Sequence, residues 1–174
     1  MGLTLLRHTR PEIDEGICYG RSDLGLPAGA EAEMAAALDG LRDAPDAIVT
    51  SPAERCRQLA ELAGQRFGLR VRQIPDLWEM DFGRWEGIAW AEIPRAELDA
   101  WAADFQHAQP HGGESVAEMA ARVEGALAAL RGGGPTLVVC HAGVQKVAAA
   151  MMGRAEAWTL SIPYGQWIAM PDDG

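Results

Sequence analysis

Four short segments place charged or titratable residues where an apolar run ends or a helical run begins. They read RHTRP, SPAERCRQ, LWEMDFGRWEG and VVCHAGV. Arg7 and Arg55 each carry a planar guanidinium group that can donate two hydrogen bonds to a tetrahedral oxyanion. Taken alone, each such residue is more often an ordinary structural one. Together they point to phosphate chemistry, because attack on a phosphoryl group needs fixed positive donors around its oxygens.

Two histidines directly follow apolar runs: His8 comes after LTLLR and His141 after TLVVC. A neutral imidazole offers a lone pair for nucleophilic attack, whereas a protonated imidazole stabilises anionic oxygens. A pair that shares this work would have one neutral ring and one protonated ring. The two titrations would be coupled if the rings are close.

A leaving alkoxide needs a proton donor, and the segment LWEMDFGRWEG contains two carboxylic acids. Glu79 is the expected donor, because burial beside Trp78 or Trp85 would raise the pKa of its carboxyl group. Asp81 lies on the same face as Glu79 if the segment is extended. It remains the second candidate for the acid.

Several residues near these segments have two interpretations. Arg10 and Arg21 are expected at the rim of the site, either in contact with the substrate or as plain surface charges. The tryptophans at 85, 90 and 101 could stack on a flat substrate group. Packing within a covering flap is the favoured interpretation for them.

Strands and helices that alternate along the chain must position these residues. Strands are expected over 2–7, 46–50, 69–75 and 137–139, with one or two more within 158–171; helices are expected over 31–44, 52–68, 115–134 and 144–153, with two short ones within 85–105. This alternation predicts an α/β fold, a three-layer α/β/α sandwich with a mostly parallel sheet. If their strands are parallel neighbours, His8 and His141 meet at one edge of that sheet.

Boundary signals support two of the helices. Ser115 and Glu118 have the spacing of a capping box, so this helix is the best defined in the chain. Pro52 and Gly68 stand where the first turn and the end of a helix are expected.

Composition limits the class of protein and its partners. The 174 residues fit a single domain over 1–174, and 48% hydrophobic with 23% charged residues is typical of a globular protein. A formal net charge of −10 disfavours binding to nucleic acid or to a membrane surface. We expect a small-molecule partner, and no sequence pattern fixes an oligomeric state.

The cysteines and the N-terminus point to a reducing compartment. Cys18, Cys56 and Cys140 are an odd number without CxxC spacing. No apolar run reaches the length of a membrane span, and no signal-peptide pattern is present. We expect a cytoplasmic protein. HxH, HExxH and CxxC spacings are all missing, so no metal or cofactor is expected.

In their order along the chain, the four segments resemble the signature of the histidine phosphatases, also called the phosphoglycerate mutase-like superfamily. That signature is Arg-His-Gly after the first strand, S-P-x-x-R, a Glu before G-x-W-E-G, and a strand that ends in His-(Gly/Ala)-Gly. Here the matches are RHT, SPAER, the Glu of LWEMDFGRWEG, and HAG, spread over residues 3 to 144. Within the superfamily, GICYGRSDLGL and EMDFGRWEG most resemble the α-ribazole phosphatases.

The resemblance implies a phosphoglycerate mutase-like fold and a role for each matching residue. His8 would be the nucleophile that forms a phosphohistidine, and Glu79 would protonate the leaving alkoxide. His8 would have to be neutral to attack. The phosphoryl oxygens would be held by Arg7, Arg55 and a protonated His141, with Ala142 beside them. The implied protein is a metal-independent phosphomonoester hydrolase, with α-ribazole 5′-phosphate of cobalamin biosynthesis as its implied substrate.

Three positions depart from the family pattern. Thr9 stands where Gly is usual, which puts in doubt the backbone contact that orients the nucleophilic imidazole. His111 and Gly25 stand where Pro is common. None of the three belongs to the phosphate-holding set.

Other mechanisms remain to be weighed. A cysteine phosphatase would use Cys140, but Lys146 stands where that mechanism needs an Arg. A metal hydrolase would need ligands from distant segments. A phosphoglycerate mutase-type phosphotransferase and a noncatalytic phosphate-binding protein are the alternatives on the same fold. Hydrolysis is favoured over the mutase because the chain is short, and over the noncatalytic protein because His8 and Glu79 are present.

Overall fold

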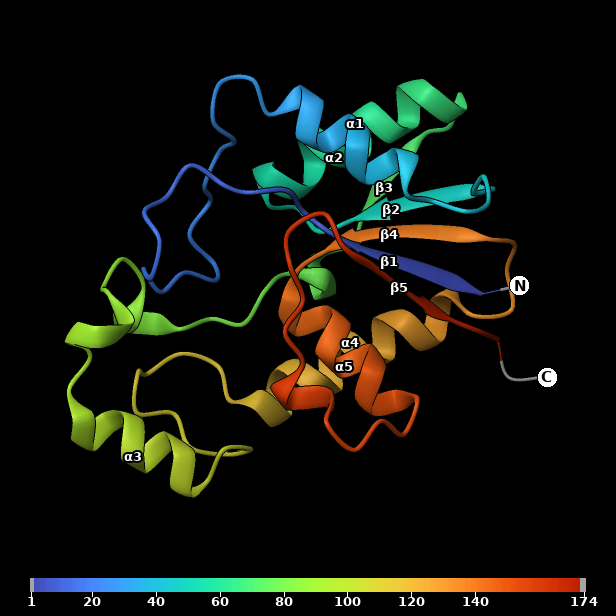
Figure 1. Cartoon of the computed structure of the whole chain (residues 1–174). Helices are drawn as coiled ribbons and strands as arrows, with labels where there is room; N and C mark the ends of the chain where they lie inside the picture. Colours follow the sequence, from blue (N-terminus) through green and yellow to red (C-terminus); the bar gives the residue numbers. More distant parts are fainter. Residues whose placement is uncertain (1, 173–174) are drawn as a thin grey trace.

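The computed structural model describes residues 2–172, and its centre is a mixed sheet of five strands (Figure 1). The strands are β1 (Leu3–Arg7), β2 (Ala47–Thr50), β3 (Val71–Gln73), β4 (Thr136–Cys140) and β5 (Trp167–Met170). Their order is β3-β2-β4-β1-β5; the first four are parallel and β5 is antiparallel to β1. The predicted mostly parallel sheet is confirmed. The ends of the predicted domain, residues 1, 173 and 174, lie outside the described residues.

Helices cover both faces of this sheet. The α-helices are α1 (Glu31–Asp39), α2 (Glu54–Phe67), α3 (Arg95–Ala103), α4 (Val116–Leu130) and α5 (Ala142–Met151). Figure 1 shows α1 and α2 on one face and α4 and α5 on the other. Because neighbouring residues of a strand point to opposite faces, Leu5 packs into the core under α4 and α5, and Leu6 into the core under α1 and α2. This is the predicted three-layer sandwich.

The helix boundaries follow local signals. The α4 capping box is present in both halves: Ser115 accepts from the backbone N–H of Glu118, and the Glu118 side chain accepts from the backbone N–H of Ser115. Helix α2 ends at Gly68, whose φ of 68° is left-handed. The helix begins at Glu54, so Pro52 lies before it and not in its first turn. Helix α1 stops at Asp39, before Gly40, and is shorter than expected.

The segment from 85 to 105 differs from the expected pair of helices. It forms single 3₁₀ turns at Gly83–Trp85 and Trp90–Glu92, and only then the helix α3. Gly87 and Pro94 leave too few residues between them for a stable helix. Trp85 is buried and packs with Cys18 and Ile93, so the favoured packing role holds for that residue.

No helix among residues 2–172 has the length and apolar character needed to cross a membrane. The strands β1 and β4 lie side by side in the sheet, and their carboxyl ends are at the same edge (Figure 1).

Candidate active site

The two histidines lie side by side because their strands are parallel neighbours. Arg7 of β1 is in register with Cys140 of β4, and the next residue of each strand is a histidine. The backbone N–H of His8 donates to the carbonyl oxygen of Cys140 at 2.9 Å. The centroids of the His8 and His141 rings are 5.2 Å apart, with ring planes at 68°.

His8 is buried, and one of its ring nitrogens is already committed to the backbone. Nδ1 lies 2.7 Å from the carbonyl oxygen of Thr9. A carbonyl oxygen only accepts hydrogen bonds, so Nδ1 carries the hydrogen and a neutral ring has its lone pair on Nε2. The orienting contact uses the Thr9 backbone, so the Thr side chain in place of Gly does not remove it.

Burial is the main cause that lowers the pKa of His8 well below its ordinary value of 6.5, and the positive charges of Arg55 and Arg7 act in the same direction. The predicted neutral form of His8 is therefore the form that its surroundings favour.

His141 is held between a serine and an arginine. Its Nε2 lies 2.8 Å from Ser51 Oγ, and its Nδ1 lies 3.4 Å from Nη2 of Arg55. An arginine nitrogen only donates, so Nδ1 accepts and Nε2–H donates to the serine. Burial, followed by the charge of Arg55, lowers the pKa of His141 well below 6.5. These protein groups therefore disfavour the protonated form expected for His141.

Arg55 is fully buried near the start of α2. Its guanidinium group donates to the carbonyl oxygens of Gly20 and Ser22, both at 2.7 Å. Its Nε is buried and has no hydrogen-bond partner among residues 2–172. A buried N–H group without an acceptor is unfavourable, so a ligand oxygen that accepts from this Nε would be stabilising.

Arg7 repeats the same feature at the end of β1. One of its terminal nitrogens donates to the carbonyl oxygen of Ile162, and its guanidinium carbon lies 4.0 Å from the centre of the Tyr164 ring. Its Nε is also buried and unpartnered in the described part of the chain. Two unpaired cationic donors thus lie near the histidine pair.

Glu79 approaches α5 closely. Its two carboxyl oxygens accept from the backbone N–H groups of Met80 at 3.0 Å and Gly143 at 3.1 Å. A Cβ on residue 143 would lie 2.1 Å from Glu79 Oε1, so this approach requires glycine. The Nε1 of Trp85, one of the two tryptophans expected beside Glu79, donates to Glu97 at 2.7 Å.

Asp81, the second candidate for the acid, is turned away. Its Oδ1 accepts from the backbone N–H of Gly83 at 2.8 Å, which closes a local turn. Asp81 is not among the residues that line the neighbouring cavity, whereas Glu79 is. Of the two carboxylic acids, the geometry favours Glu79.

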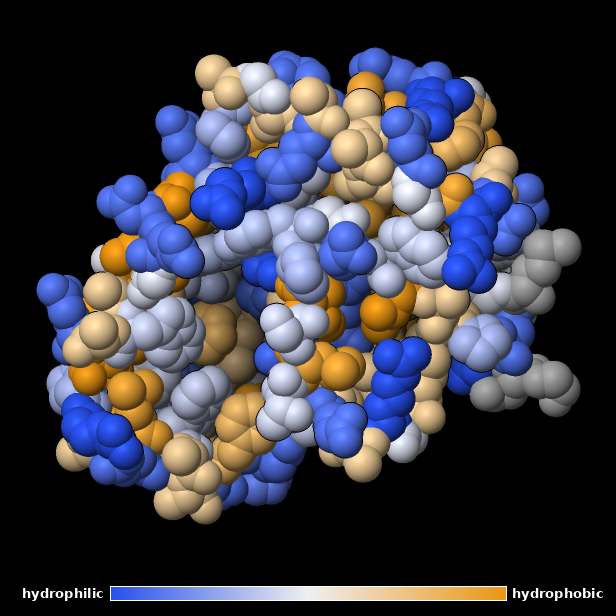
Figure 2. All heavy atoms as spheres, viewed as in Figure 1, coloured by the Kyte–Doolittle hydropathy of each residue, from blue (hydrophilic) through white to orange (hydrophobic). Residues whose placement is uncertain are grey.

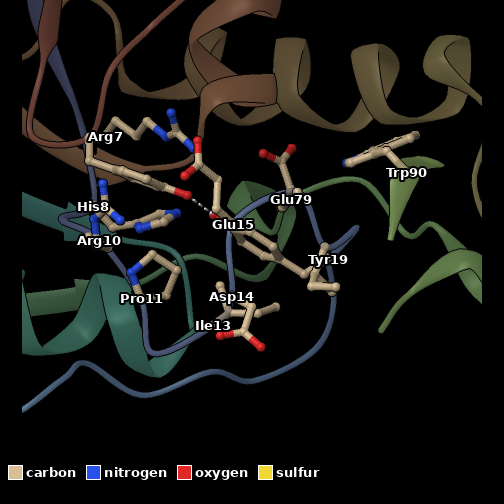
Figure 3. A pocket seen from close by; sticks show the side chains of 13 residues that line it. Arg7, His8, Arg10, Pro11, Ile13, Asp14, Glu15, Tyr19, Glu79 and Trp90 are labelled. Carbon is tan, nitrogen blue, oxygen red and sulfur yellow. Dashed lines mark hydrogen bonds between the residues drawn. The ribbon is translucent and has the colours of Figure 1, made fainter. Parts of the chain in front are cut away.

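A cavity of about 360 Å³ opens beside these groups (Figure 3). In Figure 3, Arg7 and His8 lie at one end and Trp90 at the other, with Glu79 between them. The lining residues are Arg7, His8, Arg10, Pro11, Ile13, Asp14, Glu15, Gly16, Ile17, Tyr19, Glu79, Trp90 and Tyr164. Arg55 and His141 are fully buried behind the His8 end of this cavity and do not line it.

Of the remaining predicted binding residues, one lines this cavity and two do not. Arg10 lines the cavity, as a rim residue should. Arg21 does not line it, because its Nε donates to the backbone carbonyl of Glu79 at 3.1 Å and its Nη2 lies 4.0 Å from Glu114. Arg21 is thus absent from the lining of this cavity, and its contact with the substrate stays a prediction. Ala142 begins α5 and lines a second hollow on the other side of Glu79.

Sequence reasoning missed two tyrosines. The hydroxyl groups of Tyr19 and Tyr164 are 2.8 Å apart, and both residues line the cavity. The Tyr164 ring lies 5.6 Å from that of His8, and the Tyr19 ring lies 5.3 Å from the guanidinium carbon of Arg55. Each tyrosine precedes a glycine in a loop, in CYGRSD and PYGQW, and this shared dipeptide could have drawn attention to both.

The cysteine beside His141 is a poor nucleophile. Cys140 is fully buried, and burial raises the pKa of its thiol well above its ordinary value. The thiolate is the reactive form, so this environment disfavours thiol chemistry at Cys140.

Similarity to known proteins shows the family to which this chain belongs. Residues 3–170 match the Histidine phosphatase superfamily (branch 1). The chain belongs to this superfamily.

Two curated relatives span nearly the whole chain. Glucosyl-3-phosphoglycerate phosphatase of Mycobacterium tuberculosis is 32% identical over 97% of this chain and 79% of its own length. Adenosylcobalamin/alpha-ribazole phosphatase of Escherichia coli is 34% identical over 98% of this chain and 89% of its own length.

Solved structures agree with the fold. A mycobacterial glucosyl-3-phosphoglycerate phosphatase aligns with a TM-score of 0.81 at 31% identity, over 95% of this chain and 87% of that one. A Thermus thermophilus structure named phosphoglycerate mutase aligns with a TM-score of 0.78 at 31% identity, over 97% of this chain and 92% of that one. These similarities confirm the phosphoglycerate mutase-like fold.

Proposed function

We propose that this protein hydrolyses phosphomonoesters of small molecules through a phosphohistidine on Nε2 of His8, without a metal ion. The observation that carries the proposal is the Nδ1 contact of His8 with the Thr9 carbonyl oxygen at 2.7 Å, because it directs the lone pair to Nε2. Both arginines that lower the pKa of His8, Arg7 and Arg55, have a buried Nε without an acceptor among residues 2–172. Phosphoryl oxygens are suitable acceptors for both.

The proposed reaction has two steps. In the first, Nε2 of His8 attacks phosphorus, the P–O bond to the alcohol breaks, and Glu79 transfers its proton to the leaving oxygen. In the second, water attacks phosphorus, Glu79 takes a proton from that water, and the P–N bond breaks to release inorganic phosphate. The same carboxyl group thus acts as acid and then as base.

Arg7, Arg55 and His141 would hold the phosphoryl oxygens during both steps. The charge on these oxygens peaks in the transition state, so donors fixed beforehand lower the barrier. A dianionic phosphoryl group also favours protonation of His141, opposing the effect of burial and of Arg55. The protonated form expected from the sequence would then arise only when substrate binds.

The test is the His8→Ala variant assayed with a simple alkyl phosphate in the presence of a metal chelator. We expect the wild-type enzyme to be unaffected by the chelator and the variant to lose turnover by about a thousandfold or more. His107→Ala, at an exposed position, is the matched control and should keep its activity. If His8→Ala kept its turnover, His8 would be excluded as the nucleophile. If the chelator abolished turnover of the wild-type enzyme, the protein would be a metal hydrolase.

For the substrate we propose α-ribazole 5′-phosphate. The support is the resemblance carried by GICYGRSDLGL and EMDFGRWEG and the 34% identity to the Escherichia coli enzyme of that name. Glucosyl-3-phosphoglycerate is the second candidate, because its mycobacterial phosphatase is the relative with the TM-score of 0.81. A panel with both esters, scored by kcat/KM, separates them. Release of free phosphate, as opposed to its transfer to a second hydroxyl group, separates a phosphatase from a mutase.

We also propose that the protein works in the cytoplasm as a single domain and has no nucleic-acid partner. Its three cysteines are free thiols, as a reducing compartment allows. The net charge of −10 supports a small anionic substrate held locally by arginines over any extended polyanion.

A further inference from the structure

A second hollow, of about 410 Å³, lies on the far side of Glu79 from the cavity of Figure 3. Its aromatic walls are Phe82, Trp101, Phe105 and Trp158, and most of the rest of its lining is apolar. Figure 2 shows the surface hollowed, with hydrophobic residues inside, between the part of the chain around α3 and the body built on the sheet. The proposed phosphoryl-transfer steps make no use of this space.

The two hollows are neighbours. Glu79 lines both of them. Trp90 lines the first and stacks on Trp101 of the second, with ring centroids 6.4 Å apart and ring planes within 20°. Phe82 meets both tryptophan rings edge-on, at 5.6 Å and 6.3 Å. An aromatic wall therefore runs from the first cavity into the second.

Two hydrogen-bond donors, Lys146 and Trp101, are among the residues that line the second hollow. Lys146 of α5 is half-buried, and its Nζ donates to the backbone carbonyl of Trp158 at 3.1 Å. Within residues 2–172 no carboxylate lies within ion-pair distance of this ammonium group. The buried Nε1 of Trp101 has no hydrogen-bond partner in the same part of the chain. A bound group that fills the space and brings an anionic acceptor would satisfy Lys146.

Burial lowers the pKa of Lys146, and the nearby charge of Glu79 opposes that effect. An anion in the hollow would add to the influence of Glu79 and favour the charged ammonium form.

We propose that this hollow is the leaving-group subsite and that it takes a flat aromatic group. Lys146 adds a preference for a leaving group that also carries an anionic substituent, which α-ribazole lacks. The inference rests on the proposed function. If Glu79 protonates the leaving oxygen, the group attached to that oxygen starts next to Glu79 and can extend into the second hollow. Aromatic walls favour a flat ring, through both apolar burial and ring stacking.

The test compares three alkyl esters: ethyl phosphate, 2-naphthylmethyl phosphate and its 6-carboxy derivative. All three release a primary alcohol, so differences in kcat/KM report mainly on binding of the leaving group. We expect wild-type enzyme to prefer the naphthylmethyl ester over ethyl phosphate by about tenfold or more, and to prefer the carboxy derivative further.

Two variants locate the preference. Phe105→Ala should lower the ratio of kcat/KM for the naphthylmethyl ester to that for ethyl phosphate by about tenfold. Lys146→Gln should remove the added preference for the carboxy derivative. Phe67→Ala, a half-buried phenylalanine on α2, is the matched control and should leave both ratios unchanged. A ratio measured on one sample does not depend on the fraction of folded enzyme.

The subsite would be overturned if wild-type enzyme turned over all three esters equally, or if neither Phe105→Ala nor Lys146→Gln changed the ratios. Hydrolysis of ethyl phosphate in the same assays would still support the proposed function. Binding of 2-naphthylmethylphosphonate against methylphosphonate, followed by tryptophan fluorescence, tests the subsite even in a chain without turnover. Tighter binding of the aromatic phosphonate, weakened by Phe105→Ala, supports it, and equal binding contradicts it.

Discussion

At the residue scale, the hydrogen-bond partners of each histidine distinguish their functions. Both rings are buried next to arginines, and both have pKa values lowered well below 6.5. His8 commits Nδ1 to a backbone carbonyl oxygen, and its Nε2 has no hydrogen-bond partner among residues 2–172, whereas both nitrogens of His141 face protein groups. We therefore assign attack to His8 and stabilisation of oxygens to His141.

The role of Glu79 can be separated from that of Asp81 by neutral substitutions. Glu79→Gln should lower kcat for an alkyl phosphate by about a hundredfold or more, because the alkoxide then leaves without a proton. The loss should be far smaller for 4-nitrophenyl phosphate, whose leaving group needs no proton. Asp81→Asn keeps the acceptor for Gly83 and should stay within about twofold of wild type. Steady-state kinetics with both esters give the comparison, and the reverse order of losses would make Asp81 the acid.

The sequence alone could predict which residues belong to the site better than it could predict the contacts that they make. Charged or titratable residues that follow an apolar run or begin a helix are easy to recognise in the sequence. They are Arg7, His8, Arg55, Glu79 and His141. The place of Arg21 depends on a carbonyl oxygen 58 positions away, and the tyrosine pair joins hydroxyl groups 145 positions apart. No local pattern encodes such long-range contacts.

At the scale of elements, the β1 and β4 register creates the site. Parallel pairing of Leu3 with Thr136 carries through to Arg7 with Cys140, so both histidines emerge at the same level. Two similar apolar runs, each ending in a histidine, made this pairing predictable. The 3₁₀ turns before α3 were not predictable in the same way, because burial of Trp85 against Cys18 and Ile93 shapes that segment.

The capping box of α4 allows a direct test of an element boundary. Ser115 Oγ accepts from the backbone N–H of Glu118 at 3.1 Å. Ser115→Ala should lower the free energy of unfolding by about 1 kcal/mol, because that N–H loses its acceptor. Urea denaturation of the variant measures the loss, with Ser161→Ala, an exposed loop serine, as control. Equal stability of the two variants would show that the cap contributes nothing.

At the scale of the whole molecule, an acidic protein holds a local positive cluster. The net charge is −10, yet the charged side chains that shift the pKa of His8 are two arginines, Arg55 and Arg7. The overall field repels polyanions, while the buried guanidinium groups suit one small phosphoryl group. The predicted small-molecule partner agrees with this distribution.

Buried neutral histidines make stability depend on pH. Their pKa values are lowered in the folded state, so below about pH 6.5 the unfolded chain binds more protons than the folded one. The free energy of unfolding should therefore fall as the pH drops below about 6.5 toward 5. Above that pH, both states hold these histidines neutral and their contribution to the pH dependence vanishes. His8→Asn should reduce this slope by up to about 1.4 kcal/mol per pH unit. Denaturation at several pH values tests this, and parallel curves for variant and wild type would contradict it.

Trapping the phosphorylated enzyme shows directly whether His8 is the nucleophile. Wild-type protein is mixed briefly with a labelled phosphomonoester, quenched, and digested to locate the label. We predict a label on His8 that is lost in acid and kept in base, and that is missing from His8→Ala. A label that survives acid, or one that maps to Cys140, Glu79 or another residue, would contradict a phosphohistidine at His8.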